Sequence, residues 1–137
     1  MLLEALIAIL IFSMGILAIV GMQGSAVRAT SDAKYRSDAS MLANNLIGQM
    51  WVSDRTATTL QTNFQGGNGT DGSAYTAWYS GVQATLPGAG ANPPSVAVVT
   101  VPPVLPNDPK LGQVSISIHW NLPGETPHNY AVVAQIN

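Results

Sequence analysis

The feature that most constrains this chain of 137 residues is a long stretch near its N-terminus without a charged side chain. It runs from Ala5 to Val27 and includes the 18 residues ALIAILIFSMGILAIVGM, which contain no proline. A helix needs about 20 mainly apolar residues to cross the hydrocarbon core of a bilayer. A chain this short cannot surround such a helix with its own residues, so the stretch predicts a helix covered by lipid or by other copies of itself.

A cleaved secretory signal is the other common explanation of an apolar N-terminal stretch. Such a signal opens with positive charge and ends at a small-residue cleavage site followed by unrelated sequence. Here the opening Met1-Leu2-Leu3-Glu4 is acidic, and the helical pattern continues beyond Val27. We therefore expect the stretch to remain part of the protein.

Residues 28–51 predict an amphipathic continuation of the same helix. Apolar side chains recur there at spacings of three or four residues, on one face: Tyr35, Ala39, Leu42, Leu46 and Met50. Opposite charges four residues apart, as at Asp32 and Arg36, favour the helix slightly. No proline occurs before Pro87. We expect one helix of about 50 residues, roughly 75 Å long, whose apolar stripe packs against the chain's own head.

The composition changes from Thr56 onward, where nine of the 13 glycines and all nine prolines lie. The pattern predicts a loop at 66–72, a short helix from Tyr75 to Leu86, and strands at 96–101, 114–120 and 130–136. The predicted fold class is α+β, in which a long N-terminal helix packs by its C-terminal half on a small antiparallel sheet. We divide the chain into a helical domain, 1–53, with its apolar span at 1–27, and a globular head, 54–137.

The composition argues against several functions. The chain has no cysteine, which excludes disulfides, thiolate metal sites and cysteine nucleophiles. Only 9% of the residues are charged and the net charge is −2, so attraction to nucleic acid is not expected. We predict no catalytic residue, no cofactor and no metal site.

The loop at 67–72 formally matches the dinucleotide-binding pattern G-x-G-x-x-G. That motif requires a buried strand before it and a helix under the phosphates, and residues 59–65 do not have the pattern of a buried strand. As a calcium loop, it offers the single carboxylate of Asp71, where several oxygen ligands are needed. We interpret it as a plain loop.

The histidines and tryptophans are interpreted as ordinary structural residues. His119 alternates onto the polar face of its predicted strand and His128 lies at a predicted turn, so both are expected on the surface. Trp51, Trp78 and Trp120 are large apolar anchors, which usually lie in the core.

Glu4 is the one ionisable side chain at the edge of the charge-free stretch. It either sits at the level of the lipid headgroups with little consequence, or it is buried and paired with a cation. No Lys or Arg lies within one helical turn of it. The nearest candidate is an N-terminal amine, which a neighbouring copy could supply if the copies were staggered along the helix axis.

Small residues predict close contact between helices in the same region. Gly21, Ser25, Ala29 and Ala33 repeat every four positions, with Gly15 nearby. Such spacing lets helix backbones approach closely where the hydrophobic effect between helices is weak. The candidate helix–helix packing residues are Gly15, Gly21, Ser25 and Ala29.

The opening MLLEALIAIL at residues 1–10 resembles the N-terminus of a processed type IV pilin or pseudopilin. A more specific resemblance, to PilV-type minor pilins, rests on Ser13, Gly15, Gly21, Met22, Gln23, Ala26, Arg28, Tyr35, Arg36 and Ser37. Looser similarity to the head of that family lies at Trp78, Leu86-Pro87-Gly88 and 114–120. The resemblance is specific over about the first 50 residues.

The sequence departs from the family pattern at three points. In the family, a leader peptide is removed and a Phe opens the processed chain one residue before the position of Met1, so we expect this sequence to be a mature subunit that is either one residue short or renumbered. The proline that many major pilins have near Gly21 is absent, which favours a minor pilin. The C-terminal cysteine pair of many pilins is absent too, so a loop there would depend on packing.

The resemblance implies a structural subunit of the pilin fold without catalysis. A prepilin peptidase would cleave and N-methylate it, and an ATP-driven assembly platform would move it from the bacterial inner membrane, where it is a single-pass protein, into an extracellular pilus (fimbrium). Its partners would be other pilin subunits, with Glu4 paired to the terminal amine of an adjacent subunit. A minor pilin of this type primes assembly or sits in the tip complex, sometimes with an adhesin. The alternatives are a minor pseudopilin of type II secretion and a membrane-tethered monomeric binding domain.

Overall fold

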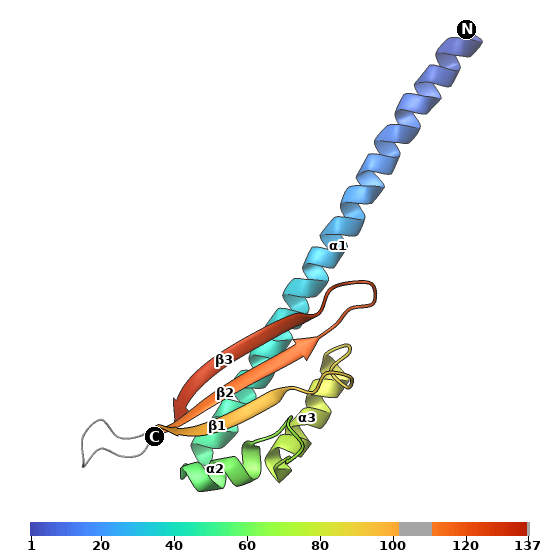
Figure 1. Ribbon diagram of the computed structural model, residues 1–137. Coiled ribbons are helices and arrows are strands. Elements are labelled where there is room, and N and C mark those ends of the chain that lie inside the picture. The colour runs from blue at the N-terminus through green and yellow to red at the C-terminus, as the bar shows by residue number, and fades with distance from the viewer. Residues whose placement is uncertain (102–110, 137) are drawn as a thin grey trace. The chain divides into compact units, whose positions relative to one another are not determined.

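The computed structural model describes residues 1–101 and 111–136. Its elements, in chain order, are α1 (Leu2–Val52), α2 (Ala57–Phe64), α3 (Ser73–Thr85), β1 (Ser95–Val101), β2 (Leu111–Trp120) and β3 (His128–Ile136) (Figure 1). They fall into two compact units, Met1–Lys34 and the residues from Tyr35 onward. The predicted α+β class, with a long N-terminal helix and a small antiparallel sheet, is confirmed.

Helix α1 is 51 residues long, and its part from Tyr35 to Val52 supplies one wall of the core in the second unit. The buried positions are Ala39, Ala43, Leu46 and Met50. Tyr35 and Leu42, which were also expected on this stripe, are partly buried against the same core. Ala43, one turn after Ala39, is buried too, although it was not expected on this stripe.

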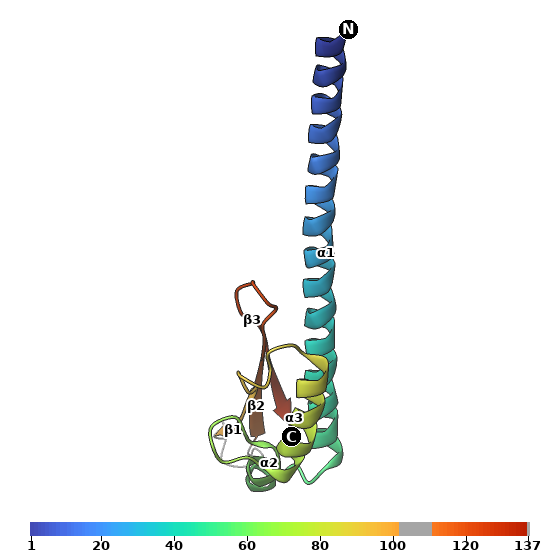
Figure 2. The same cartoon turned by 90° about the vertical axis from the view of Figure 1, so that its right-hand side faces the viewer.

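The sheet has the order β1-β2-β3, and both strand pairs are antiparallel. Alternate residues of its strands point into the core, among them Val96, Val98, Val114, Ile116, Ile118 and Trp120. Figures 1 and 2 show the sheet as one layer, with the C-terminal part of α1 and α3 forming the other. All three strands were expected, and each is longer by one to three residues than the sequence pattern indicated.

Helix α2 was not expected from the sequence. It begins just after Asp54, whose carboxylate accepts hydrogen bonds from the amide of Thr56 (3.0 Å) and the hydroxyl of Thr59 (3.0 Å). These two bonds, the amide first, lower the pKa of Asp54. The helix buries Leu60 and Phe64. With eight residues and two apolar anchors, it has too little periodicity to be recognised from sequence.

The loop after α2 is fixed to the sheet by backbone pairing. Gly66 exchanges both backbone hydrogen bonds with Val96, at 3.1 and 2.9 Å. A Cβ at Gly66 would overlap the ring of Tyr75, so the close approach of the loop to α3 requires glycine. Gly67 follows with a φ of 90°, which glycine adopts without strain.

Candidate functional site: the N-terminal helix surface

The first unit exposes every large apolar side chain that it contains between Met1 and Val27. These are sixteen residues, with exposed fractions from 46% at Ile16 to 102% at Met1. Burying one such side chain contributes about 1.5–3 kcal/mol, so covering all sixteen is worth tens of kcal/mol. That exceeds the whole stability of a typical domain, about 5–15 kcal/mol. The surface therefore needs a cover of lipid or protein.

The length and composition of α1 make it the one helix in the described part of the chain that could cross a membrane. The two hydroxyl residues of the first unit that make side-chain hydrogen bonds are satisfied within the helix. Ser13 donates to the carbonyl of Ile9 (2.7 Å), and Thr30 donates to that of Ala26 (2.9 Å). These hydroxyls therefore need no outside partner and are tolerated in an apolar environment.

Glu4 lies exposed in the first turn of α1. Within residues 1–101 and 111–136, nothing makes a hydrogen bond or ion pair with its carboxylate. The next charged residue along the helix is Arg28, about 36 Å away at 1.5 Å per residue. A cation that neutralises Glu4 inside an apolar environment would therefore come from another molecule.

The helical geometry brings most of the predicted contact residues to one face of α1. Successive residues of an α-helix are turned by about 100°. Glu4, Gly15, Ser25 and Ala29 consequently lie within an arc of about 80°. Gly21 lies about 120° from Gly15, so these predicted packing residues do not all share one face.

A seven-residue repeat runs along this arc in register with Glu4. Its members, at alternating spacings of four and three, are Glu4, Ala8, Ile11, Gly15, Ala18, Met22, Ser25 and Ala29. We call this set the Glu4 seam. Ala8 and Ala18 were missed because a strict spacing of four, which leads to Gly21, drifts around the helix, whereas a 4-3 spacing stays on one face. A Cβ at Gly15 would meet no atom within 4 Å, so nothing inside the described chain requires glycine there.

Two surface depressions of the second unit are lined by described residues. One, of about 400 Å³, lies beside the loop at 67–72, where Asp71 accepts a hydrogen bond from the amide of Gly67 (2.8 Å). Its lining holds one carboxylate, and the described residues contain no cluster of three or more His, Cys, Asp or Glu that could hold a metal. The arrangement has the internal hydrogen bonding of a structural loop.

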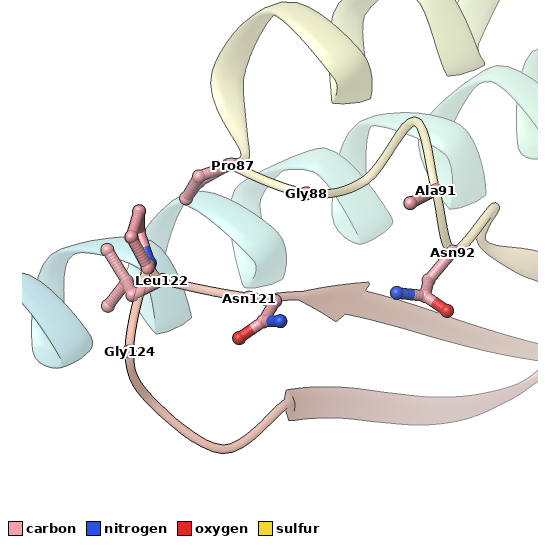
Figure 3. A pocket seen from close by; sticks show the side chains of 8 residues that line it. Pro87, Gly88, Ala91, Asn92, Asn121, Leu122 and Gly124 are labelled. Atoms are coloured by element: carbon pink, nitrogen blue, oxygen red, sulfur yellow. The ribbon is translucent and has the colours of Figure 1, made fainter.

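The other depression, of about 370 Å³, lies between the turn after α3 and the turn after β2 (Figure 3). It is lined by Pro87, Gly88, Ala91, Asn92, Asn121, Leu122, Pro123 and Gly124. The amide of Asn121 donates to the carbonyl of Pro87 (2.9 Å), which ties the two turns together. The lining contains two side-chain amides and no charged or nucleophilic group, so it offers no catalytic arrangement.

Two aromatic predictions are corrected. Trp51 is 41% exposed, with the guanidinium of Arg55 5.9 Å from its ring centroid, whereas Trp78 and Trp120 are buried as expected. Trp51 follows the buried Met50 and is turned about 100° from it around the helix, so Trp51 faces away from the core. His128 is packed more closely than a surface histidine, because its ring stacks on Trp120 with centroids 5.7 Å apart.

No family model, curated protein or solved structure matches this chain.

Proposed function

We propose that this protein is a structural subunit of a type IV pilus, a minor pilin that enters the filament through α1 and acts in assembly or in the tip complex. The observation that carries the proposal is the Glu4 seam on an uncovered apolar helix. A helix that serves only as an anchor needs apolar residues, but it needs neither a carboxylate nor small residues in register with that carboxylate.

The magnitudes support a role for Glu4 as a specifying residue. A carboxylate deep in a bilayer costs on the order of 3 kcal/mol, against the tens of kcal/mol that the sixteen exposed apolar side chains contribute when covered. The helix therefore tolerates Glu4 but gains free energy when the carboxylate meets a cation. The N-terminal amine of an axially staggered neighbour supplies that cation in the proposed filament.

The small residues of the seam give the neighbour room to approach. Side chains at Ala8, Gly15, Ala18 and Ser25 end at or near Cβ, which allows close backbone packing where helices have no hydrophobic drive to associate. Before assembly the same surface faces lipid, and the protein is a single-pass protein of the bacterial inner membrane. Prepilin peptidase and the pilus assembly platform are its partners at that stage, and pilin subunits are its partners in the extracellular filament.

The test is to compare Glu4→Ala with Leu3→Ala in cells that form pili. Leu3 lies in the same turn and is also exposed, so its substitution controls for the loss of side-chain volume. We expect Glu4→Ala to remain in the membrane fraction and to disappear from sheared filaments, and Leu3→Ala to enter filaments normally. Wild-type amounts of Glu4→Ala in filaments would refute the assigned role.

The two alternatives are separated by other readouts. Loss of protein secretion with intact pili on deletion of the chain would indicate a type II pseudopilin, which has the same helix chemistry. A protein that never crosslinks through α1 to pilin subunits would be a monomeric membrane-tethered domain.

A further inference from the structure

The two edges of the sheet differ in whether other parts of the chain cover their backbone groups. The outer edge of β1 is covered, because Gly66 takes both backbone groups of Val96 and the side-chain amide of Gln61 donates to the carbonyl of Val98 (2.9 Å). Helix α2 packs along the same strand. An added strand cannot reach that edge.

The direction of the backbone groups on β3 follows from this pairing. In an antiparallel sheet, each residue directs its backbone N–H and C=O to the same side of its strand, and successive residues alternate between the two sides. Since Val96 points away from β2, its partner Ile116 points toward β3, where it meets Val132. The backbone groups directed to the free side of β3 are therefore those of Asn129, Ala131, Val133 and Gln135. No residue among those described hydrogen-bonds with these four amides and four carbonyls.

Strand β3 also lacks the features that usually prevent pairing at an edge. Its nine residues, HNYAVVAQI, contain no proline and no Asp, Glu, Lys or Arg. Its register with β2 is regular from Gly112↔Ile136 to Trp120↔His128, without a bulge. Natural sheets protect exposed edges with charge, proline, bulges or short strands. An unprotected edge opposite a covered one indicates a binding edge.

We infer that the free edge of β3 binds an extended strand of another protein and adds a fourth strand to the sheet. Only an extended backbone presents amides and carbonyls at the spacing of these four residues. Tyr130 and Val132 pack at the margin of the core and are only partly buried, so the partner strand places apolar side chains beside them. Because β3 has no formal charge to pair with, the partner segment is uncharged.

A second copy of the chain is the other conceivable occupant. Its β1 edge is covered, so two copies would meet through β3 and β3, in an antiparallel pair related by a two-fold axis. In Figures 1 and 2 the strands run roughly along the C-terminal part of α1. The pair would set the two α1 segments antiparallel, whereas subunits of a filament have parallel helices. This step rests on the proposed function.

The test uses the full chain in detergent micelles and a synthetic peptide of alternating valine and threonine with a lysine at each end. Amide hydrogen exchange is measured at the four outward-facing residues of β3. With the peptide at ten times its Kd, we expect their exchange to slow by about elevenfold. Val133→Pro removes one outward donor and leaves the ladder to β2 intact, so it should abolish the protection. Thr100→Pro, at an outward-facing position of β1, is the matched control and should retain it.

Three results would overturn the inference. The first is exchange of the four amides at the same rate with and without the peptide. The second is protection of these amides already in the isolated chain, which would mean that the chain covers its own edge. Protection that rises with protein concentration alone would assign the edge to a second copy. None of these results bears on entry of the protein into pili, which the Glu4 variants test separately.

Discussion

The indole Nε1 of Trp78 donates a hydrogen bond to the main-chain carbonyl of Leu42, with a nitrogen–oxygen distance of 3.0 Å. A helical carbonyl in mid-helix already accepts one backbone amide, so Trp78 uses its second lone pair. The ring of Trp78 also lies 5.9 Å from that of Tyr75. The hydrogen bond ties α3 to the C-terminal part of α1, while the contact of the two rings packs neighbouring turns of α3 in the core.

Replacing Trp78 by Phe should therefore destabilise the second unit by about 2 kcal/mol, through the lost hydrogen bond and the smaller ring. Trp51→Phe is the matched control, because Trp51 is 41% exposed, and it should change stability by less than about 0.5 kcal/mol. Denaturant unfolding of the full chain in micelles, followed by circular dichroism, measures both. Equal effects of the two substitutions would contradict this account of α3.

Substituting alanine at two glycines should change the stability of the protein in opposite directions. At Gly66, a Cβ would overlap the ring of buried Tyr75, so Gly66→Ala should cost about 1–3 kcal/mol. At Gly48, within α1, a Cβ would meet nothing within 4 Å, so Gly48→Ala should stabilise by about 0.5–1 kcal/mol. The melting temperatures of the two variants should bracket that of the wild type.

The fold was largely predictable from sequence because its main elements carry strong periodic signals. The charge-free stretch and the absence of proline before Pro87 determine a single long helix, and alternation from Val114 to Trp120 determines the central strand. Helix α2 depends instead on the hydrogen bonds of Asp54 and on contacts with β1. The hydrogen bonds of Asp54 are local but not periodic, and the contacts with β1 join residues distant in sequence, so neither leaves a helical pattern of apolar residues.

The candidate site was predictable in part. The isolated position of Glu4 identifies it in the sequence, since its chemistry depends on the absence of nearby charge. Whether Glu4 and Gly15 share a face depends on the rotation of about 100° per residue summed over several turns. A search for small residues spaced by four ignores the drift of that spacing around the helix. The predicted burial of Trp51 was wrong for a related reason, because the residue next to a buried one lies on another side of the helix.

Alkaline pH should destabilise the protein through Tyr75. Its hydroxyl donates to the carbonyl of Pro94 (2.6 Å), and burial, with a smaller effect of Asp71, raises its pKa from 10.0 to about 12. The folded state therefore holds this proton more tightly than the unfolded state, so the stabilisation is complete below pH 10 and is lost as the pH rises toward 12.

The check is the free energy of unfolding between pH 9 and about pH 12. Tyr75→Phe should cost about 1 kcal/mol at neutral pH, through its lost hydrogen bond, and should show a weaker decline at alkaline pH. An unchanged slope in Tyr75→Phe would assign the alkaline loss to other groups.

The phase of the Glu4 seam predicts unequal effects of two otherwise similar substitutions. Gly15→Leu places a large side chain on the seam, whereas Gly21→Leu places the same side chain outside it, about 120° around the helix from Gly15 and about 40° from the edge of the seam at Ser25. Both replace an exposed helical glycine whose Cβ meets nothing in the described chain, so helix formation and membrane insertion should gain equally. If the seam faces a neighbouring subunit, Gly15→Leu should lower incorporation into filaments at least about tenfold, the result of a lost contact of 1.4 kcal/mol or more. Quantification of sheared filaments against the membrane fraction separates the two variants, and a greater loss for Gly21→Leu would place the contact on the face defined by spacing of four.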